Sequence, residues 1–133
     1  MTDSKKNQAP CPARVLIGNA FPLSLVRGHR VTIEELSLDE LRQMLNASEP
    51  DSFWGHENTR AIAEATLGVS LKPAVERPAM VLDSEGYPML DGRSYKVCYV
   101  LSPDYTPGFR PQIGAEVAAA DIHAWHALRL TWN

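Results

Sequence analysis

One stretch, Ala13-Arg-Val-Leu-Ile17-Gly18-Asn19-Ala20-Phe21-Pro22, passes from a strand pattern to a sharp break. Its first part, residues 13–17, is apolar and partly β-branched, which predicts a short buried strand. Glycine and asparagine tolerate unusual backbone angles and Pro22 ends strand pairing, so we expect the strand to stop near Gly18. Asn19 then lies at the carboxyl end of a strand, where ligands often bind in mixed α/β sheets.

A second stretch places a histidine where a helix begins, in Trp54-Gly55-His56-Glu57-Asn58-Thr59. Residues 57–67 have apolar side chains close to helical spacing, and Gly68 is a natural stop. Asn58 and Thr59 are residue types that can satisfy the free N–H groups of a first turn. The amino end of a helix attracts phosphate, and imidazole exchanges protons near neutral pH. The stretch therefore predicts a catalytic histidine beside a phosphate, or a histidine that merely caps or packs against the helix.

The remaining pattern predicts further strands and one more clear helix. We expect strands over residues 31–36, 78–82, 95–101 and 126–132. A capping box, Ser37-Leu-Asp-Glu40, predicts a helix that continues to about Asn46. Its buried stripe is expected to comprise Leu38, Leu41, Met44 and Leu45. The whole pattern indicates a small mixed α/β domain with a mixed β-sheet flanked by helices.

Three segments between these elements are expected to be irregular or weakly helical. Residues 48–52 resemble a loop, and residues 102–114 contain enough proline and glycine to predict a long ordered loop or flap. That loop carries Asp104, Tyr105 and Arg110, polar groups that are useful at a site. Residues 116–123 are alanine-rich and predict a short helix.

The composition of the 133-residue chain predicts one ordinary globular domain, with 44% hydrophobic and 22% charged residues. A net charge of −3 without a basic run argues against binding long nucleic acid. No apolar run reaches membrane-spanning length. The two cysteines form no disulfide framework, and with no secretory segment we expect a cytoplasmic protein. Residues 1–12 resemble a flexible tail, and residues 13–133 a single domain.

Other chemistries find little support in the residue pattern. Asp121, His123 and His126 invite a metal site, but no further histidine cluster completes one, so we expect no metal and no cofactor. The glycines match no phosphate-loop or dinucleotide fingerprint.

The two stretches together resemble a known family. Leu16-Ile-Gly-Asn19-Ala20-Phe21-Pro-Leu-Ser24-Leu25 and Gly55-His56-Glu57-Asn58-Thr59 are similar to the signature segments of the viral anti-CRISPR and CRISPR-associated ring nucleases of type III systems. Members of that family have a strand followed by Asn-Ala-Phe, then Gly-His with a threonine three residues after the histidine. The order of elements fits across residues 13–132.

The resemblance implies a mixed α/β homodimer that binds cyclic tetra-adenylate or a related cyclic oligoadenylate and cuts the ring without a metal, which switches off type III CRISPR signalling. A ribose 2′-hydroxyl attacks the adjacent phosphorus and the 5′ oxygen leaves, giving a 2′,3′-cyclic phosphate. Carried over by position, His56 is the general acid. The implied ligand-binding residues are Asn19, Ala20, Phe21, Ser24, Gly55, Asn58 and Thr59.

The chain departs from the family after the strand expected over residues 95–101. Viral members have a closely spaced arginine and glutamate there, whereas this chain has Ser102-Pro-Asp-Tyr105. The nearest substitutes are Arg110, which could steady the phosphate, and Glu116, which could orient the 2′-hydroxyl. Two alternatives therefore stay open. One is a nucleotide-binding sponge or sensor with little turnover, and the other is a protein-binding regulatory factor that uses the loop over residues 102–114.

Overall fold

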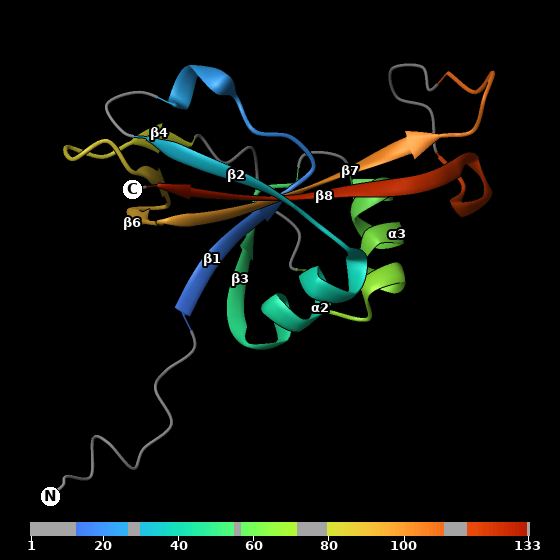
Figure 1. Cartoon of the computed structure of the whole chain (residues 1–133), viewed down its shortest axis with the longest axis horizontal. Coiled ribbons are helices and arrows are strands. Elements are labelled where there is room, and N and C mark those ends of the chain that lie inside the picture. The colour runs from blue at the N-terminus through green and yellow to red at the C-terminus, as the bar shows by residue number, and fades with distance from the viewer. Residues whose placement is uncertain (1–12, 27–29, 55–56, 72–79, 111–116, 133) are drawn as a thin grey trace, which may run out of the picture.

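The chain folds around a five-stranded mixed sheet in the order β2-β8-β7-β1-β3 (Figure 1). The computed structural model describes residues 13–26, 30–54, 57–71, 80–110 and 117–132. The large sheet consists of β1 (Ala13–Gly18), β2 (Val31–Leu36), β3 (Ser48–Ser52), β7 (Val97–Tyr105) and β8 (Ile122–Trp132). The helices are α2 (Leu38–Asn46) and α3 (Glu57–Leu67), with two short 3₁₀ turns at Leu23–Leu25 and Ala119–Asp121. A small sheet contains β4 (Val81–Leu82), β5 (Pro88–Leu90) and β6 (Arg93–Ser94).

Strand β1 has a parallel neighbour on each side, which confirms the predicted mixed α/β class. It pairs with β3, with Ile17 opposite Ser52, and with β7, with Leu16 opposite Cys98. Leu16 and Ile17 are completely buried. Because successive side chains of a strand point to opposite faces, Leu16 and Ile17 enter two separate apolar clusters.

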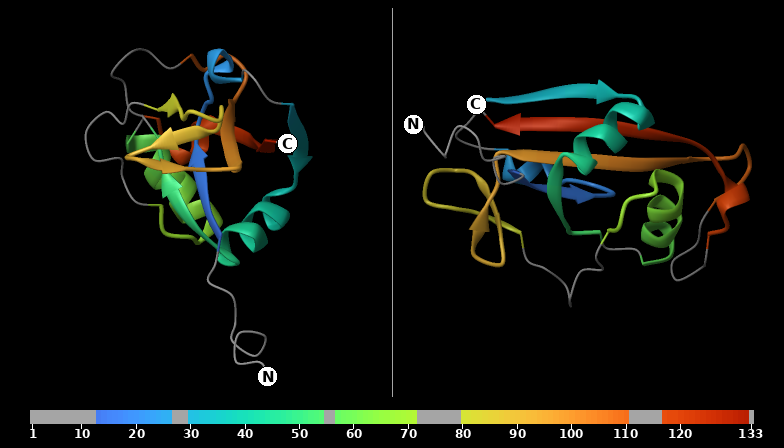
Figure 2. Two further views of the ribbon diagram at one scale, coloured as in Figure 1. Left: turned by 90° about the vertical axis from the view of Figure 1, so that its left-hand side faces the viewer. Right: turned by 90° about the horizontal axis from the view of Figure 1, so that it is seen from below.

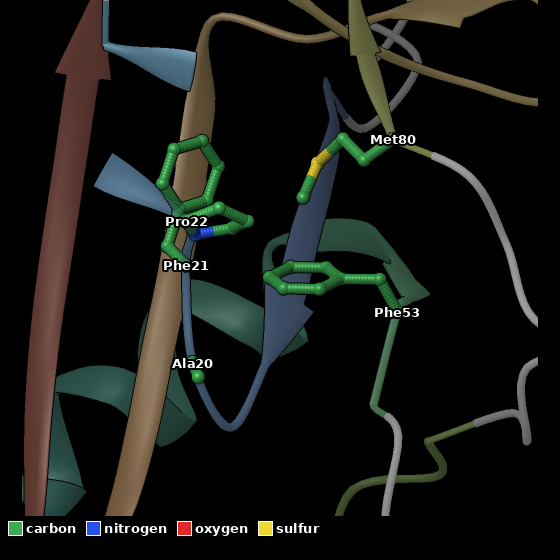
Figure 3. A pocket seen from close by; sticks show the side chains of 5 residues that line it. All are labelled: Ala20, Phe21, Pro22, Phe53 and Met80. Carbon is green, nitrogen blue, oxygen red and sulfur yellow. The ribbon is translucent and has the colours of Figure 1, made fainter. Parts of the chain in front are cut away.

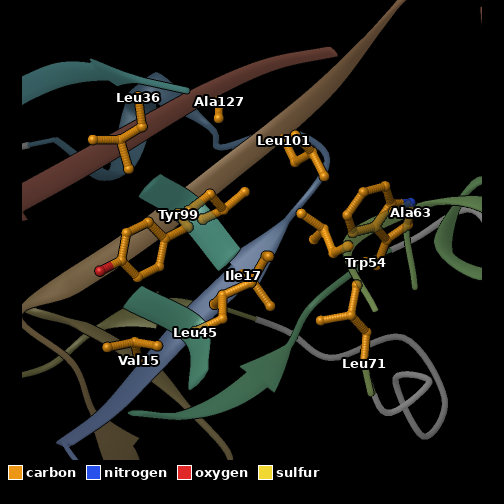
Figure 4. Packing of buried hydrophobic residues seen from close by; sticks show 12 residues of the cluster. Val15, Ile17, Leu36, Leu45, Trp54, Ala63, Leu71, Tyr99, Leu101 and Ala127 are labelled. Atoms are coloured by element: carbon orange, nitrogen blue, oxygen red, sulfur yellow. The ribbon is translucent and has the colours of Figure 1, made fainter. Parts of the chain in front are cut away.

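The first cluster lies between the sheet and the two helices, α2 and α3 (Figure 4). The predicted capping box is present, since the Ser37 hydroxyl accepts from the Glu40 amide and the Glu40 carboxylate accepts from the Ser37 amide. Leu41 and Leu45 are buried, as the helical period predicts. The prediction for Met44 is wrong: this residue is 37% exposed and lies beside Arg129 of β8.

The second cluster fills the opposite face of the sheet. It contains Leu16, Cys98, Val100, Leu130 and Trp132 from the large sheet, with Leu90 and Tyr95 from the segment that forms the small sheet. Figures 1 and 2 show the small sheet near the carboxyl end of β8, while α3 lies at the opposite end of the long β7–β8 hairpin. Both faces of the sheet are therefore covered, and Cys98 is the predicted core residue. Burial raises the pKa of its thiol.

Residues 48–52 form a strand, so the predicted loop is wrong. β3 is an edge strand whose sequence, Ser-Glu-Pro-Asp-Ser, has no apolar alternation. Arg14 of β1 holds it by hydrogen bonds to Glu49 (2.6 Å) and Asp51 (2.7 Å). The Tyr95 hydroxyl donates to Asp51 as well, at 2.6 Å. Polar contacts across one strand pair therefore replace the hydrophobic signal that identifies most strands.

Strands β7 and β8 are longer than the sequence predicts. β7 continues to Tyr105, so the segment 102–105 is strand and not loop, and β8 begins at Ile122 within the expected helix of residues 116–123. Only Ala119–Asp121 of that alanine-rich segment forms a turn of 3₁₀ helix. Pro103 is tolerated because β1 pairs with β7 only up to Val100, and beyond that point β7 is an edge where a missing N–H costs little.

Gly18 is required because the Phe53 ring lies close to the backbone at the end of β1. A Cβ atom added there would overlap the ring of Phe53, the residue that follows β3. Gly18 therefore lets the Phe53 ring lie directly on the end of β1.

A Gly18→Ala variant is expected to lower the free energy of unfolding by about 1–3 kcal/mol, because the added methyl displaces the ring. Urea denaturation measures this loss. In a Phe53→Leu background the same substitution should cost clearly less, since the obstructing ring is absent. An equal loss in both backgrounds would show that Phe53 does not cause the strain.

Candidate functional site

The two stretches that resemble the ring nucleases meet at one edge of the sheet. β1 and β3 are parallel neighbours, so their carboxyl ends lie side by side, and the Phe53 amide donates to the Ile17 carbonyl at 2.9 Å. Asn19 follows β1 directly, and α3 begins at Glu57, shortly after the end of β3. The carboxyl edge of parallel strands is where α/β proteins usually bind ligands.

The backbone at Asn19 is fixed by the neighbouring strand. The Ser102 hydroxyl of β7 donates to the Asn19 carbonyl at 3.0 Å. Asn19 is half-buried, whereas Ala20 and Ser24 are exposed. The predicted ligand residues of this segment are therefore accessible from solvent next to the end of β1.

The first turn of α3 is held by internal hydrogen bonds. Asn58 accepts from the Val117 amide through its side-chain oxygen. The Thr59 hydroxyl accepts from the Trp54 indole N–H at 2.9 Å, and both residues are only 3% exposed. The Trp54 ring also contacts Trp125 of β8 edge to face, with ring centroids 6.4 Å apart.

The Thr59 hydroxyl thus helps to position the start of α3 against Trp54, and its place near a ligand stays a prediction. Asn58 remains half-buried at the same end of the helix.

An apolar hollow of about 370 Å³ lies beside this edge (Figure 3). Its lining residues are Ala20, Phe21, Pro22, Phe53 and Met80. The Phe21 and Phe53 rings are nearly perpendicular, at 84°, with centroids 6.4 Å apart. Figure 3 shows the Met80 side chain pointing toward the space between Phe53 and Pro22. Two of the predicted ligand residues, Ala20 and Phe21, therefore line a hollow large enough for a planar ring.

A polar pair lies on the extension of the β7–β8 hairpin. His126 Nε2 is 3.5 Å from Asp104 Oδ2, and both side chains are more than half exposed. In the register of the hairpin His126 lies directly opposite Ser102. The sequence singles out Asp104 and His126 separately, but only the pairing of β7 with β8 brings them together.

The other predicted residues are Arg110, His56, Gly55 and Glu116. Arg110 is exposed beyond the turn that follows β7, and the structure shows no contact between it and Asn19 or Asn58 among the interactions it describes. His56, Gly55 and Glu116 lie outside the described residues. Their assigned roles stay predictions.

Sequence reasoning missed Phe53 and Met80. Phe53 follows a strand that has no apolar pattern, and Met80 comes from a distant part of the chain, so nothing local connects either residue with Phe21.

In the described segments, no group of three or more His, Cys, Asp or Glu side chains is placed to hold a metal ion. None of the helices in those segments is both long and apolar enough to span a membrane.

Comparison with known proteins identifies a fold and no family. No family model matches the chain, and no curated protein matches it. Among solved structures, the chain is similar to B116 of Sulfolobus turreted icosahedral virus, with a TM-score of 0.56 and 15% sequence identity. The match covers 90% of this chain and 99% of the viral protein. At this identity the similarity shows that the two chains share a fold.

We expect Thr59→Val to lower the free energy of unfolding by about 1–3 kcal/mol, because it leaves the buried Trp54 indole N–H without this acceptor. Thr66→Val is the matched control, since Thr66 is an exposed threonine of the same helix. It should change stability by roughly 0.5 kcal/mol or less. Chemical denaturation of both variants, followed by tryptophan fluorescence, makes the comparison. Equal losses would mean that the Trp54–Thr59 bond does not hold α3.

Proposed function

We propose that this chain is a metal-independent ring nuclease that cleaves a cyclic oligoadenylate, with cyclic tetra-adenylate as the first candidate. One observation carries the proposal. The two segments that resemble the ring-nuclease signatures are far apart in sequence, yet they follow two adjacent parallel strands, β1 and β3. Asn19 and the amino end of α3 therefore lie at the same edge of the sheet.

The local chemistry at that edge supports the proposal. The first amides of an eleven-residue helix, Glu57–Leu67, supply partial positive charge for a phosphodiester. The aromatic hollow beside Asn19 offers an apolar surface for an adenine ring. The net charge of −3 suits a small anionic ligand held by local groups better than a long nucleic acid.

In the proposed reaction the substrate supplies its own nucleophile. A ribose 2′-hydroxyl loses its proton to water and attacks the adjacent phosphorus, the bond from phosphorus to the 5′ oxygen breaks, and His56 gives a proton to the departing oxygen. The products are a 2′,3′-cyclic phosphate and a free 5′-hydroxyl. The protein has to align the 2′ oxygen with the breaking bond and supply the proton, and neither task needs a metal-bound water.

We expect the purified protein to linearise cyclic tetra-adenylate in excess EDTA, with products resolved by chromatography. His56→Ala should slow cleavage by roughly 10²–10⁴-fold, the usual contribution of a general acid, while binding persists. His123→Ala is the control, as an exposed histidine of β8 outside the proposed site. Tight binding with no turnover would replace the nuclease by a nucleotide sponge, and the absence of binding would remove the proposal.

The proposal includes a twofold dimer, since a symmetric ring suits two identical subunits that each contribute one histidine. Light scattering at micromolar concentration should therefore give twice the mass of the 14.7 kDa chain. A strictly monomeric mass, both with and without cyclic tetra-adenylate, would contradict a cavity shared by two subunits.

A further inference from the structure

The Asp104–His126 pair lies close to Asn19, and Ser102 is the link between them. Alternate residues of a strand share a face, so Ser102 and Asp104 follow Val100, which belongs to the second cluster. His126 lies directly opposite Ser102 in the pairing of β7 with β8, so their Cα atoms are about 5 Å apart. The Ser102 hydroxyl donates to the Asn19 carbonyl at 3.0 Å. A single side chain therefore separates the pair from a predicted ligand residue.

The start of α3 lies on the opposite face of the same hairpin. Trp125 precedes His126 in β8, so their side chains point to opposite faces. The Trp125 ring contacts Trp54, whose indole donates to Thr59 in the first turn of α3. Among the described strands, β1 pairs with β7 only as far as Val100, so the edge of β7 is open beyond that point. A ligand at the end of β1 can thus meet α3 from one face and the pair from the other.

The proposed reaction needs one proton-transfer group on each side of the phosphorus atom. The attacking 2′ oxygen and the departing 5′ oxygen lie roughly in line through phosphorus, so a base and an acid must act from opposite directions. His56, the predicted acid, precedes α3 in the sequence. The side opposite α3, where the base belongs, is the side that carries Asp104 and His126.

The geometry of the pair suits an imidazole that accepts a proton. His126 Nε2 is 3.5 Å from Asp104 Oδ2. A carboxylate beside this nitrogen favours the tautomer with its proton on Nε2, which leaves the lone pair on Nδ1. The same carboxylate stabilises the imidazolium once it forms. Both side chains are more than half exposed, so a ligand can reach them.

We propose that His126 is the general base of the ring cleavage and that Asp104 is a positioning residue that orients its imidazole. The assignment rests on the proposed function. His126 Nδ1 takes the 2′-hydroxyl proton in place of water while the 2′ oxygen forms its bond to phosphorus. The bond from phosphorus to the 5′ oxygen breaks, and His56 gives that oxygen a proton. Water then removes the proton from His126 and returns one to His56, so both histidines end unchanged.

A ring with sulfur in place of the departing 5′ oxygen separates the base from the acid. A thiolate leaves without being protonated, so His56→Ala should cleave this thio ring nearly as fast as wild type. His126→Gln should cleave both the natural ring and the thio ring roughly 10²–10⁴-fold more slowly than wild type, because the 2′-hydroxyl still needs a base. The assay follows a single turnover by the full chain in excess EDTA.

Asp104→Asn tests the positioning role. An amide does not stabilise an imidazolium, so cleavage of both rings should fall by roughly tenfold. In a His126→Gln background the same change should cost little more, because Asp104 acts through the imidazole. His123→Gln, at an exposed histidine of the same strand, is the matched control and should cleave both rings at the wild-type rate. All these variants should unfold at the same urea concentration as wild type, since the substituted side chains are exposed.

Three results would overturn the proposal and keep the nuclease. His126→Gln could cleave the natural ring at the wild-type rate, or the thio ring could restore its rate as it does for His56→Ala. Asp104→Asn could also lose its full tenfold in the His126→Gln background. Failure of wild type to cleave either ring in EDTA would instead remove the proposed function, and the general base with it.

Discussion

Strand β1 must bury both of its faces and pair on both of its edges, and the rest of the fold follows from this constraint. Ile17 needs an apolar cover on one side, which α2 and α3 provide, and Leu16 needs one on the other, which the small sheet provides. Parallel pairing with β3 and β7 brings the carboxyl ends of the strands to one edge. The candidate site lies where it does because the central strand ends there, at Gly18.

Much of this arrangement could be predicted from residue pattern alone. The run 31–36, the capping box at Ser37 and the helix that ends before Gly68 all carry strong local signals, and each is present. Gly68 adopts the positive φ, 67°, expected of a residue that terminates a helix. The position of Asn19 after a strand was also predictable, because Gly18-Asn19 and Pro22 mark the break.

The missed elements share a physical reason. β3 is stabilised by Arg14 across the strand pair, so its own sequence is polar, and the extension of β7 past Val100 is held by pairing with β8. In both cases the neighbouring strand supplies the stabilising contacts, so the local sequence pattern does not reveal the strand. The hollow and the Asp104–His126 pair follow the same rule, since each combines residues that only strand register brings together.

The edge of β3 also constrains how copies of this chain can associate. An exposed edge strand invites another strand to pair with it, and natural proteins prevent this with prolines and charges. β3 has Pro50, which offers no N–H, between Glu49 and Asp51, whose carboxylates are already engaged by Arg14. An incoming strand would disturb these ion pairs, and the ladder of hydrogen bonds that it formed would lack the one from Pro50. An additional strand is therefore disfavoured along β3, whereas the edge strand β2 at the other side of the sheet carries Ile33, which is 56% exposed.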